Sequence, residues 1–379
     1  MSSLIEAMPN EQLAYIAEKL IHQQRLSHDE GVLLLETEHD EAVRLLADYE
    51  RKRKVGDIVY FASTLFIHPT NLCELSCRMC SFYAKPGWEK AWFLTPETIE
   101  AQIKQYHPKG LTEIHIVGGL WRECNLDYYQ NLFTRIKNID QNLHIKALTP
   151  VEYDFLAKLH GLTIEEVFQR MIGWGLGSLP GGGAEILVEE IRKKLAPGKI
   201  TSDEYLSIHR IAHQMGLRSN ISMLFGHIES SEHIATHLCR VRELQDETGM
   251  IQTFVPLKYH VENNTLGRKL KPANEARTRR VYAVSRLMLD NVRNIKALWN
   301  YLGIQEGQKA LEYGANCYAS TAFEEKIIVM AGGVKVKMTK ELIMQLITEV
   351  GRIPLEIHSG HDYTKDYTPE NNLITSASL

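Results

Sequence analysis

Three cysteines are crowded into one short stretch of the chain, at Cys73, Cys77 and Cys80. Their spacing is C-x3-C-x2-C, and the sequence contains no second C-x2-C pair. Cysteine thiolates bind zinc and iron–sulfur clusters. A loop that supplies three sulfurs leaves one iron of a 4Fe–4S cluster without a protein ligand, and a catalytic metal needs such an open position. The pattern therefore predicts a catalytic iron–sulfur cluster.

Two alternatives use the same cysteines differently. A structural zinc site would take His68 or His115 as its fourth ligand, although zinc motifs usually contain two ligand pairs separated by a spacer. Three unrelated buried cysteines are the other alternative, which the crowding disfavours. For the cluster, the missing ligands at the open iron would be the amino and carboxylate groups of S-adenosylmethionine. One electron would then break the sulfonium and form a 5′-deoxyadenosyl radical, whose chemistry the protein directs.

The elements that must position these residues alternate between strand and helix. Residues 1–56 have helical periodicity, with Leu13, Ile16 and Leu20 on one face. Beyond them the sequence predicts strands at Ile58–Ile67, Glu113–Val117, His144–Leu148, Leu176–Leu179, Ser219–Leu224, Thr253–Leu257, Lys296–Tyr301 and Leu311–Gly314. Helices are predicted near residues 95–106, 127–138, 151–173, 202–215, 231–248, 273–292 and 304–310. This alternation implies a parallel sheet, so we expect an α/β fold, a full or near-full (βα)8-type TIM barrel.

The expected fold also predicts where the chemistry lies, because barrel active sites form at the carboxyl ends of the strands. Polar and glycine-rich residues follow the predicted strands at 68–71, 118–120, 180–185, 226–229 and 258–260. We expect three parts in the chain: a helical N-terminal extension over residues 1–56, the barrel over 57–335, and a C-terminal helix with a loose tail packing on the barrel over 336–379.

Composition narrows the class of protein. The chain has 379 residues, is 44% hydrophobic and 24% charged, and carries a formal charge of −4. DNA-coating proteins usually have a strong basic excess, so we interpret the basic run Arg51–Lys54 as a solvated helix end rather than a nucleic-acid patch. No run of eighteen apolar residues occurs, and Met1–Pro9 does not resemble a secretory signal. We expect a cytoplasmic enzyme with no nucleic-acid or membrane partner.

Several blocks make the sequence recognisable: Pro69–Asn71, Gly118–Leu120, Ser178–Glu185, His209–His213, Met223–Glu229, Arg242–Gly249 and Arg286–Asn291. With the cysteine motif, which is the radical S-adenosylmethionine signature, the chain from about residue 20 to about residue 333 resembles the aminofutalosine synthases of the futalosine pathway to menaquinone. Two sibling families share the fold: the cyclase that acts on dehypoxanthine futalosine, and the tyrosine-consuming enzyme of deazaflavin synthesis. Gly181–Gly183 favours the menaquinone enzymes, and Gly226–Glu229 looks most like the synthase.

The resemblance implies a reaction. The synthases join S-adenosylmethionine to 3-[(1-carboxyvinyl)oxy]benzoate: the radical adds to the enolpyruvyl double bond, and the adduct rearranges and loses carbon dioxide. The products are 6-amino-6-deoxyfutalosine and methionine, so S-adenosylmethionine is consumed as a substrate and the enzyme is a transferase. An electron donor such as flavodoxin or ferredoxin would be its partner. The alternatives are a sibling radical enzyme that abstracts hydrogen and, in another class, a structural zinc or nucleic-acid-binding module.

The resemblance also implies roles for individual residues. Cys73, Cys77 and Cys80 would bind the cluster, and the cofactor-binding set would be Gly118, Gly119, Glu185, Phe82 and Ser178. The two glycines follow a strand where the superfamily's backbone meets the methionine amino group, and glycine permits that close approach. The benzoate substrate carries two carboxylates, so Lys258, Arg286 and Asn316 are expected to bind it. The catalytic candidates are His260, His227 and Glu229.

Several of these residues have a structural alternative. Arg286 can be a surface helix residue and His260 a satisfied polar residue. His227 and Glu229 can cap the helix that begins near Ser230. Gly181–Gly183 can simply turn the chain into the next helix.

The chain departs from the family pattern at three predicted strand ends. Met79 stands where the superfamily usually has an aromatic residue near the adenine, for which Phe82 and Tyr83 are partial substitutes. Trp121–Cys124 replaces a His-Pro continuation, and Asn316–Thr321 lacks the two aspartates of the family's Asn-Asp-Leu-Asp-Gly-Thr. These departures leave the substrate pose, and with it the substrate, open. Cys124 and Cys317 are either a redox pair or two isolated buried thiols.

Overall fold

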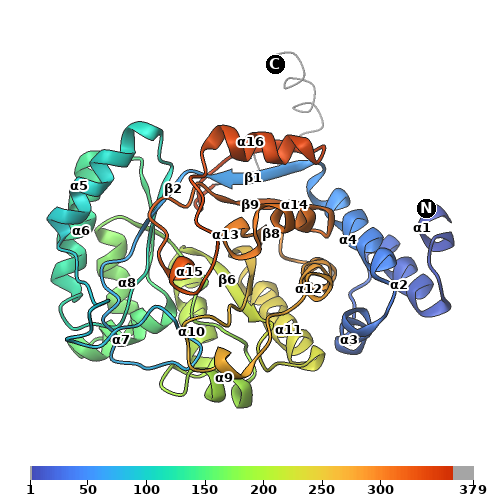
Figure 1. Ribbon diagram of the computed structural model, residues 1–379, viewed down its shortest axis with the longest axis horizontal. Helices are drawn as coiled ribbons and strands as arrows, with labels where there is room; N and C mark the ends of the chain where they lie inside the picture. The colour runs from blue at the N-terminus through green and yellow to red at the C-terminus, as the bar shows by residue number, and fades with distance from the viewer. Residues whose placement is uncertain (1, 362–379) are drawn as a thin grey trace.

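Parallel strands form the centre of the computed structural model, which describes residues 2–361 (Figure 1). The strands are β1 (Ile58–Ala62), β2 (Thr64–Ile67), β3 (Glu113–Ile116), β4 (His144–Ala147), β5 (Leu176–Leu179), β6 (Arg218–Phe225), β7 (Ile251–Lys258), β8 (Asn294–Ala297), β9 (Cys317–Ser320) and β10 (Ile353–Glu356). They pair in the order β10-β1-β9-β8-β7-β6-β5-β4-β3-β2, and every pairing is parallel.

The two ends of this order meet, because β1 and β2 are separated only by Ser63 and act as halves of one strand. β1 pairs with β9, β2 pairs with β3, and Leu65 forms a further parallel bridge to Phe323, just after β9. The sheet therefore curls into a ring with eight strand positions, and β10 is an additional strand beside β1. The predicted (βα)8-type fold is confirmed.

Helices connect successive strands of the ring: α5 (Pro96–Tyr106), α6 (Leu126–Ile139), α7 (Pro150–His160), α8 (Ile164–Gly173), α9 (Glu189–Leu195), α10 (Ser202–Gln214), α11 (Ser231–Thr248), α12 (Glu275–Met288), α13 (Trp299–Leu302) and α14 (Ile304–Glu312). Many begin at a side-chain cap, as at Thr95 and Thr201. The single helix predicted over 151–173 is two helices. Gly161 ends α7 in a left-handed conformation with φ of 63°, and Thr163 then caps α8.

The last two strand predictions need correction. The run Lys296–Tyr301 is only partly strand, because β8 ends at Ala297 and α13 begins at Trp299. The run Leu311–Gly314 lies at the end of α14 and in the turn that follows, and the strand is β9, at Cys317–Ser320. Short apolar runs do not distinguish a buried strand from a buried helix end, and Gly314, with φ of 94°, belongs to the turn.

The N-terminal helices are α1 (Ser2–Glu6), α2 (Glu11–Ile21), α3 (His28–Glu36) and α4 (Asp40–Val55), and Figure 1 shows them grouped at one end of the molecule. α3 and α4 pack against α11 and α12 of the barrel. The basic run at the end of α4 is partly solvated, as expected, since Lys52 and Arg53 are exposed, but its two arginines pair with carboxylates of the same helix. Arg51 is buried and contacts Asp48 at 2.8 Å, and Arg53 contacts Glu50 at 2.7 Å. Within residues 2–361, the helices are too short or too polar to span a bilayer.

The segment that follows the last strand covers the amino-terminal end of the barrel. α15 (Ile327–Met330) is followed by α16 (Lys340–Glu349), the expected C-terminal helix, and then by β10, which was not predicted. After β10, the backbone N–H of Ser359 donates to Glu113 Oε2 (2.9 Å), at the start of β3. Arg218, at the start of β6, donates to the carbonyl of His361 (3.0 Å). The predicted loose tail, residues 363–379, lies outside the described residues.

Candidate active site

The strands enclose a cavity of about 360 Å³ that opens at their carboxyl ends. Most strand residues that line it alternate, as side chains on one face of a strand do: Thr64 and Phe66 on β2, Glu113 and His115 on β3, Lys146 on β4, Asn220, Ser222 and Leu224 on β6, Val255 and Leu257 on β7, and Lys296 on β8. At the carboxyl ends of β7 and β9, the next residues, Lys258 and the pair Ala319–Ser320, line it as well. Cys73, Cys77 and Cys80 line the same cavity. The fold therefore brings the cysteine motif and the polar barrel interior into one chamber.

The cysteine loop follows β2 and is anchored on both sides. The backbone N–H of Cys73 donates to the carbonyl of Ala84 (3.1 Å), and that of Arg78 donates to the carbonyl of Leu195 (3.0 Å). The ammonium of Lys85 donates to three consecutive carbonyls, those of Cys73, Glu74 and Leu75, at 2.8 to 3.1 Å. These contacts hold the loop in the shape that directs its thiols to the cavity.

The donor set fits a cluster. The three cysteines are free thiols, and burial raises the pKa of Cys77 to about 11, so metal binding must displace a proton. In the described part of the chain, no three His, Cys, Asp or Glu side chains converge closely enough to hold one metal ion. A 4Fe–4S cluster needs no such convergence, because each thiolate binds a different iron. Three separate thiols around one cavity suit a cluster with an open iron.

Gly118 and Gly119 line the cavity just after β3 and pack against the segment that leads into the cysteines. A Cβ on Gly119 would lie 2.1 Å from the carbonyl oxygen of Leu72, so only glycine fits there. The N–H of Gly118 donates to Glu152 Oε1 (2.9 Å). Burial raises the pKa of Glu152 to about 7. The hydrogen bonds that its carboxylate accepts from backbone N–H groups lower the pKa and only partly offset this effect.

The glycine run after β5 packs closely on its neighbour strand. A Cβ on Gly181 would lie 2.7 Å from the backbone of Ile221 in β6. Close packing, and not only chain reversal, therefore requires glycine at this position. Glu185 lines the cavity in a left-handed conformation, with φ of 50°, and forms an ion pair with Lys199. Its carboxylate is thus already engaged by a lysine that also faces the chamber.

Three further predicted residues line the cavity: Phe82, Lys258 and His260. Phe82 packs edge-on against Trp92, with ring centroids 5.3 Å apart, and Met79 and Tyr83 line the same region. His260 Nε2 donates to the carbonyl of Tyr301 (2.9 Å), and burial lowers its pKa. His260 is therefore a neutral imidazole with one ring nitrogen already engaged.

Arg286, Asn316 and Ser178 do not line the cavity, and the expectation that they bind substrate or cofactor stays a prediction. Arg286 is completely buried and donates to the carbonyl of Gly314 (2.8 Å) and to Asn316 Oδ1 (2.7 Å). Ser178 contacts His144 Nε2 at 2.7 Å, level with the first residue of β6. These side chains satisfy each other's polar groups in the barrel wall and at its base.

His227 and Glu229 also lie outside the cavity lining, and the catalytic role expected for them stays a prediction. Glu229 accepts hydrogen bonds from the backbone N–H groups of Gly226 (2.6 Å) and His227 (2.8 Å), and its carboxylate lies 2.9 Å from His227 Nδ1. The pair closes the turn after β6. The cap of α11 is formed instead by Ser230 with His233.

Cys124 and Cys317 are far apart in the barrel. Cys124 follows the carboxyl end of β3, whereas Cys317 is the first residue of β9 and packs on Tyr60. The isolated-thiol interpretation therefore holds, and both cysteines are free. The segment Asn316–Thr321 was expected to lie at the carboxyl end of its strand, but it spans the whole of β9. Within it, Ala319 and Ser320 line the cavity.

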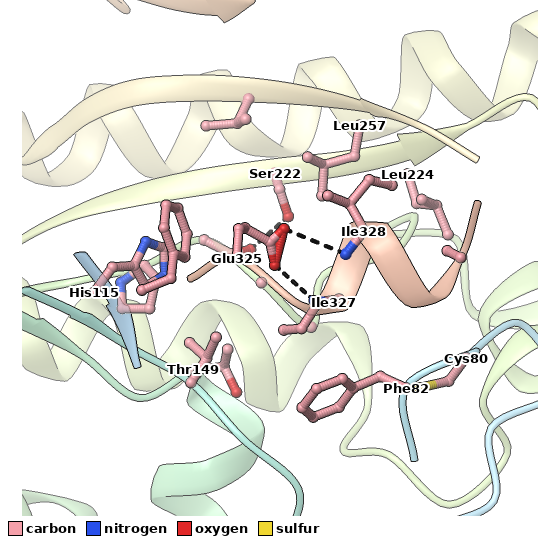
Figure 2. A pocket seen from close by; sticks show the side chains of 18 of the residues that line it. Cys80, Phe82, His115, Thr149, Ser222, Leu224, Leu257, Glu325, Ile327 and Ile328 are labelled. Atoms are coloured by element: carbon pink, nitrogen blue, oxygen red, sulfur yellow. Dashed lines mark hydrogen bonds between the residues drawn. The ribbon is translucent and has the colours of Figure 1, made fainter. Parts of the chain in front are cut away.

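Other cavity residues were not predicted from the sequence, namely Glu152, Lys199, Lys296 and Glu325, and His115 was considered only as a zinc ligand. Figure 2 shows His115 and Cys80 on opposite sides of the chamber, with Glu325 between them. Glu325 accepts hydrogen bonds from the N–H groups of Ile327 (2.7 Å) and Ile328 (3.3 Å) at the start of α15. His115 and Lys296 point inward from their strands. The alternation of side chains along a strand would have predicted this, but only once the register of the strand is known.

Comparisons with known proteins agree with this geometry. Residues 67–238 match the family model of the Radical SAM superfamily, and residues 247–370 match that of the CofH/MqnC C-terminal region. The chain therefore belongs to the radical SAM superfamily, whose enzymes use a 4Fe–4S cluster and S-adenosylmethionine. The predicted family resemblance is confirmed.

Within the superfamily, the similar proteins carry the names expected from the sequence blocks. The chain is 36% identical to the aminodeoxyfutalosine synthase of Thermus thermophilus, over 90% of this chain and 93% of that protein. It is 33% identical to the cyclic dehypoxanthine futalosine synthase of Halalkalibacterium halodurans, over 93% and 95% of the two chains. It is 34% identical to a 5-amino-6-(D-ribitylamino)uracil–L-tyrosine 4-hydroxyphenyl transferase of Methanococcus maripaludis, over 90% and 97%.

Among solved structures, the fold is similar to that of the FeFe-hydrogenase maturase HydG from Carboxydothermus hydrogenoformans. The TM-score is 0.72 at 18% identity, over 93% of this chain and 81% of that chain. At this identity the likeness concerns the fold alone.

Proposed function

We propose that this protein is a radical S-adenosylmethionine transferase of the aminodeoxyfutalosine synthase type. It would join S-adenosylmethionine to 3-[(1-carboxyvinyl)oxy]benzoate and release methionine, carbon dioxide and 6-amino-6-deoxyfutalosine. The observation that carries this proposal is the composition of the cavity: three cysteine thiols and two lysines without an acidic partner, Lys258 and Lys296, line the same chamber. A site for reductive cleavage of S-adenosylmethionine thus faces a site for a dicarboxylate.

Charge pairing in the cavity favours this reaction over that of the tyrosine-consuming sibling family, since the identities of 36% and 34% are too similar to distinguish the two. The described carboxylates of the cavity are all engaged. Glu113 and Glu185 pair with lysines, and Glu152 and Glu325 accept hydrogen bonds from backbone N–H groups. The ammonium of a tyrosine substrate would have to compete with these donors for a carboxylate, whereas an anion with two carboxylates finds two lysines.

The residues of the chain would act by binding, orienting and excluding water. Cys73, Cys77 and Cys80 would hold the cluster, which supplies the electron that splits S-adenosylmethionine. Gly118 and Gly119 allow the backbone to approach a ligand closely. Apolar side chains that line the chamber, among them Leu224, Leu257 and Ile328, exclude the water that would divert a reactive intermediate. His260, with Nε2 held by a carbonyl, presents only Nδ1 for contact with the substrate.

The same proposal implies a partner and a compartment. One electron must reach the cluster, so a donor such as flavodoxin or ferredoxin is required. A cluster with an open iron and three free thiols suits the reducing cytoplasm.

Anaerobic turnover with product analysis tests the function. The protein is reconstituted with iron and sulfide, reduced with dithionite, and given S-adenosylmethionine with the enolpyruvyl benzoate. Mass spectrometry should detect aminodeoxyfutalosine with little free 5′-deoxyadenosine, and a Cys80→Ala variant should form neither. Free 5′-deoxyadenosine without adduct would refute the assigned reaction and point to hydrogen abstraction, as proposed for the sibling families.

A further inference from the structure

The lysines that line the cavity outnumber the carboxylates that pair with them. Four lysines line it, and two of them are neutralised: Lys146 by Glu113 and Lys199 by Glu185. Among residues 2–361, no carboxylate lies within 4.0 Å of the ammonium of Lys258 or Lys296, and neither ammonium donates a hydrogen bond. A partly buried ammonium without a partner is costly, so an anion is expected to complete each of these two positions.

Lys296 is unpaired because the carboxylate at the base of the cavity is already saturated. Glu113 accepts hydrogen bonds from the Lys146 ammonium, the Thr64 hydroxyl, and both the N–H and the hydroxyl of Ser359. The base of the chamber therefore holds two lysines, Lys146 and Lys296, against a single, fully used carboxylate. The charge of Glu113 acts on both lysines, and a single carboxylate leaves one positive charge at the base without a counter-ion.

An aromatic wall lies beside this base. Phe66 and His115 stack with ring centroids 4.7 Å apart and an interplanar angle of 28°, and both line the cavity. Burial holds the pKa of His115 well below its ordinary value, so its ring is neutral. His115 is level with Lys146 in the pairing of β3 with β4. A flat aromatic ring can therefore pack on this wall while its carboxylate reaches the lysines.

The two unpaired lysines are separated along the barrel axis. Phe254 of β7 pairs with Ile295 of β8, so Lys296 is level with Val255. Lys258 is three residues further toward the carboxyl end, which is about 10 Å along the strands. Long lysine side chains at this spacing can contact both ends of an aryl ether that carries a carboxylate at each end. Lys258 is the last residue of β7, so it lies at the carboxyl end of the strand, where the cavity opens.

We propose that Lys296 binds the aryl carboxylate of the substrate and Lys258 binds the enolpyruvyl carboxylate, with the benzoate ring against Phe66 and His115. This inference rests on the proposed function and assigns the polarity with which its substrate binds. The polarity follows from the position of the cysteines: the reacting double bond belongs to the enolpyruvyl end, which must face the cysteine side. Figure 2 shows that His115, beside the base, lies on the side of the cavity opposite Cys80.

A crossed binding experiment on the reconstituted protein tests the assignment. Three unreactive probes are used: 3-(carboxymethoxy)benzoate with both carboxylates, phenoxyacetate without the aryl carboxylate, and 3-methoxybenzoate without the side-chain carboxylate. Each lysine is changed to methionine, which keeps most of the length of the side chain and removes its charge. Exposed Lys335→Met is the matched control.

The two variants should lose affinity for different probes. Lys296→Met should weaken binding of the dicarboxylate and of 3-methoxybenzoate about 10- to 100-fold, the range of a hydrogen bond to a charged group, and leave phenoxyacetate unchanged. Lys258→Met should weaken binding of the dicarboxylate and phenoxyacetate and leave 3-methoxybenzoate unchanged. Lys296→Arg, which retains the charge, should recover part of the affinity and guards against misfolding of the methionine variant.

The outcomes separate this inference from the proposed function. A reversed pattern would overturn the assigned polarity, and equal or absent effects on all probes would overturn the two subsites, even if wild-type enzyme forms aminodeoxyfutalosine. If the crossed pattern appears but the complete substrate gives no adduct, the subsites stand and the proposed reaction fails.

Discussion

The substitution Gly119→Ala adds one methyl group beside the cysteine loop without touching a cysteine. A Cβ at this position would lie 2.1 Å from the carbonyl oxygen of Leu72 and 2.8 Å from its carbonyl carbon. Both obstructing atoms belong to the backbone, so no side-chain rotation can relieve the contact. Leu72 directly precedes Cys73, and any displacement therefore reaches the first proposed cluster ligand.

The structure sets the size of the effect. Normal contact requires the Leu72 backbone to move by about 1 Å. Two hydrogen bonds flank the clash and resist this movement: Gly119 N–H to the Thr70 carbonyl (2.8 Å) and Glu74 N–H to the Leu120 carbonyl (2.9 Å). Overpacking costs about 1–3 kcal/mol and each lost hydrogen bond about 1 kcal/mol. A net loss of about 3 kcal/mol corresponds to a fall in Tm of about 4 °C for a chain of this length.

Two measurements on the same sample test the reasoning: the melting temperature of the apo-protein, and the iron and sulfide bound after anaerobic reconstitution. A displacement of 1 Å exceeds the tolerance of about 0.5 Å for a ligand constellation, so cluster content should fall further than stability alone predicts. Gly173→Ala is the control, because a Cβ there meets no atom within 4 Å. A Gly119→Ala protein with wild-type melting and full cluster content would show that the loop yields freely, and would refute the argument.

Three further outcomes follow from the contacts. Lys85→Met removes the donor shared by three loop carbonyls, so a chelator should extract iron faster than from wild type, and Lys85→Arg should show a smaller change. Burial lowers the pKa of His213 from 6.5 to about 4, so the unfolded chain binds one more proton between these values. Stability contributed by this neutral histidine is then lost as pH falls from 6.5 to 4, by about 3 kcal/mol, and His213→Gln should flatten the dependence of the urea midpoint on pH over that interval. Cys124→Ala and Cys317→Ala should retain the full iron content, because both thiols lie outside the cavity lining, whereas Cys77→Ala should not.

Much of the barrel was predictable because its signals are local. Each of the first six strands is an apolar run of suitable length, and helix starts such as Thr95-Pro96 and Thr149-Pro150 carry their own caps. The errors arose where the local signal is ambiguous. Leu311–Gly314 is apolar because the end of α14 packs on the barrel, and β10 is a partly exposed strand whose partner, β1, lies about 300 residues earlier in the chain.

The sequence by itself determined the cysteine motif, the family and the ends of strands at which the cofactor residues lie, because all of these depend on spacing within short segments. Only the tertiary structure decided which charged residues are free to bind a substrate. Arg286 donates its hydrogen bonds to Gly314 and Asn316, and Lys146 forms an ion pair with Glu113. Lys296 lines the cavity without a carboxylate in ion-pair contact. Pairing of this kind depends on the register between strands far apart in the sequence. A shift of the register by one residue would turn a side chain from the chamber to the outer face of the barrel.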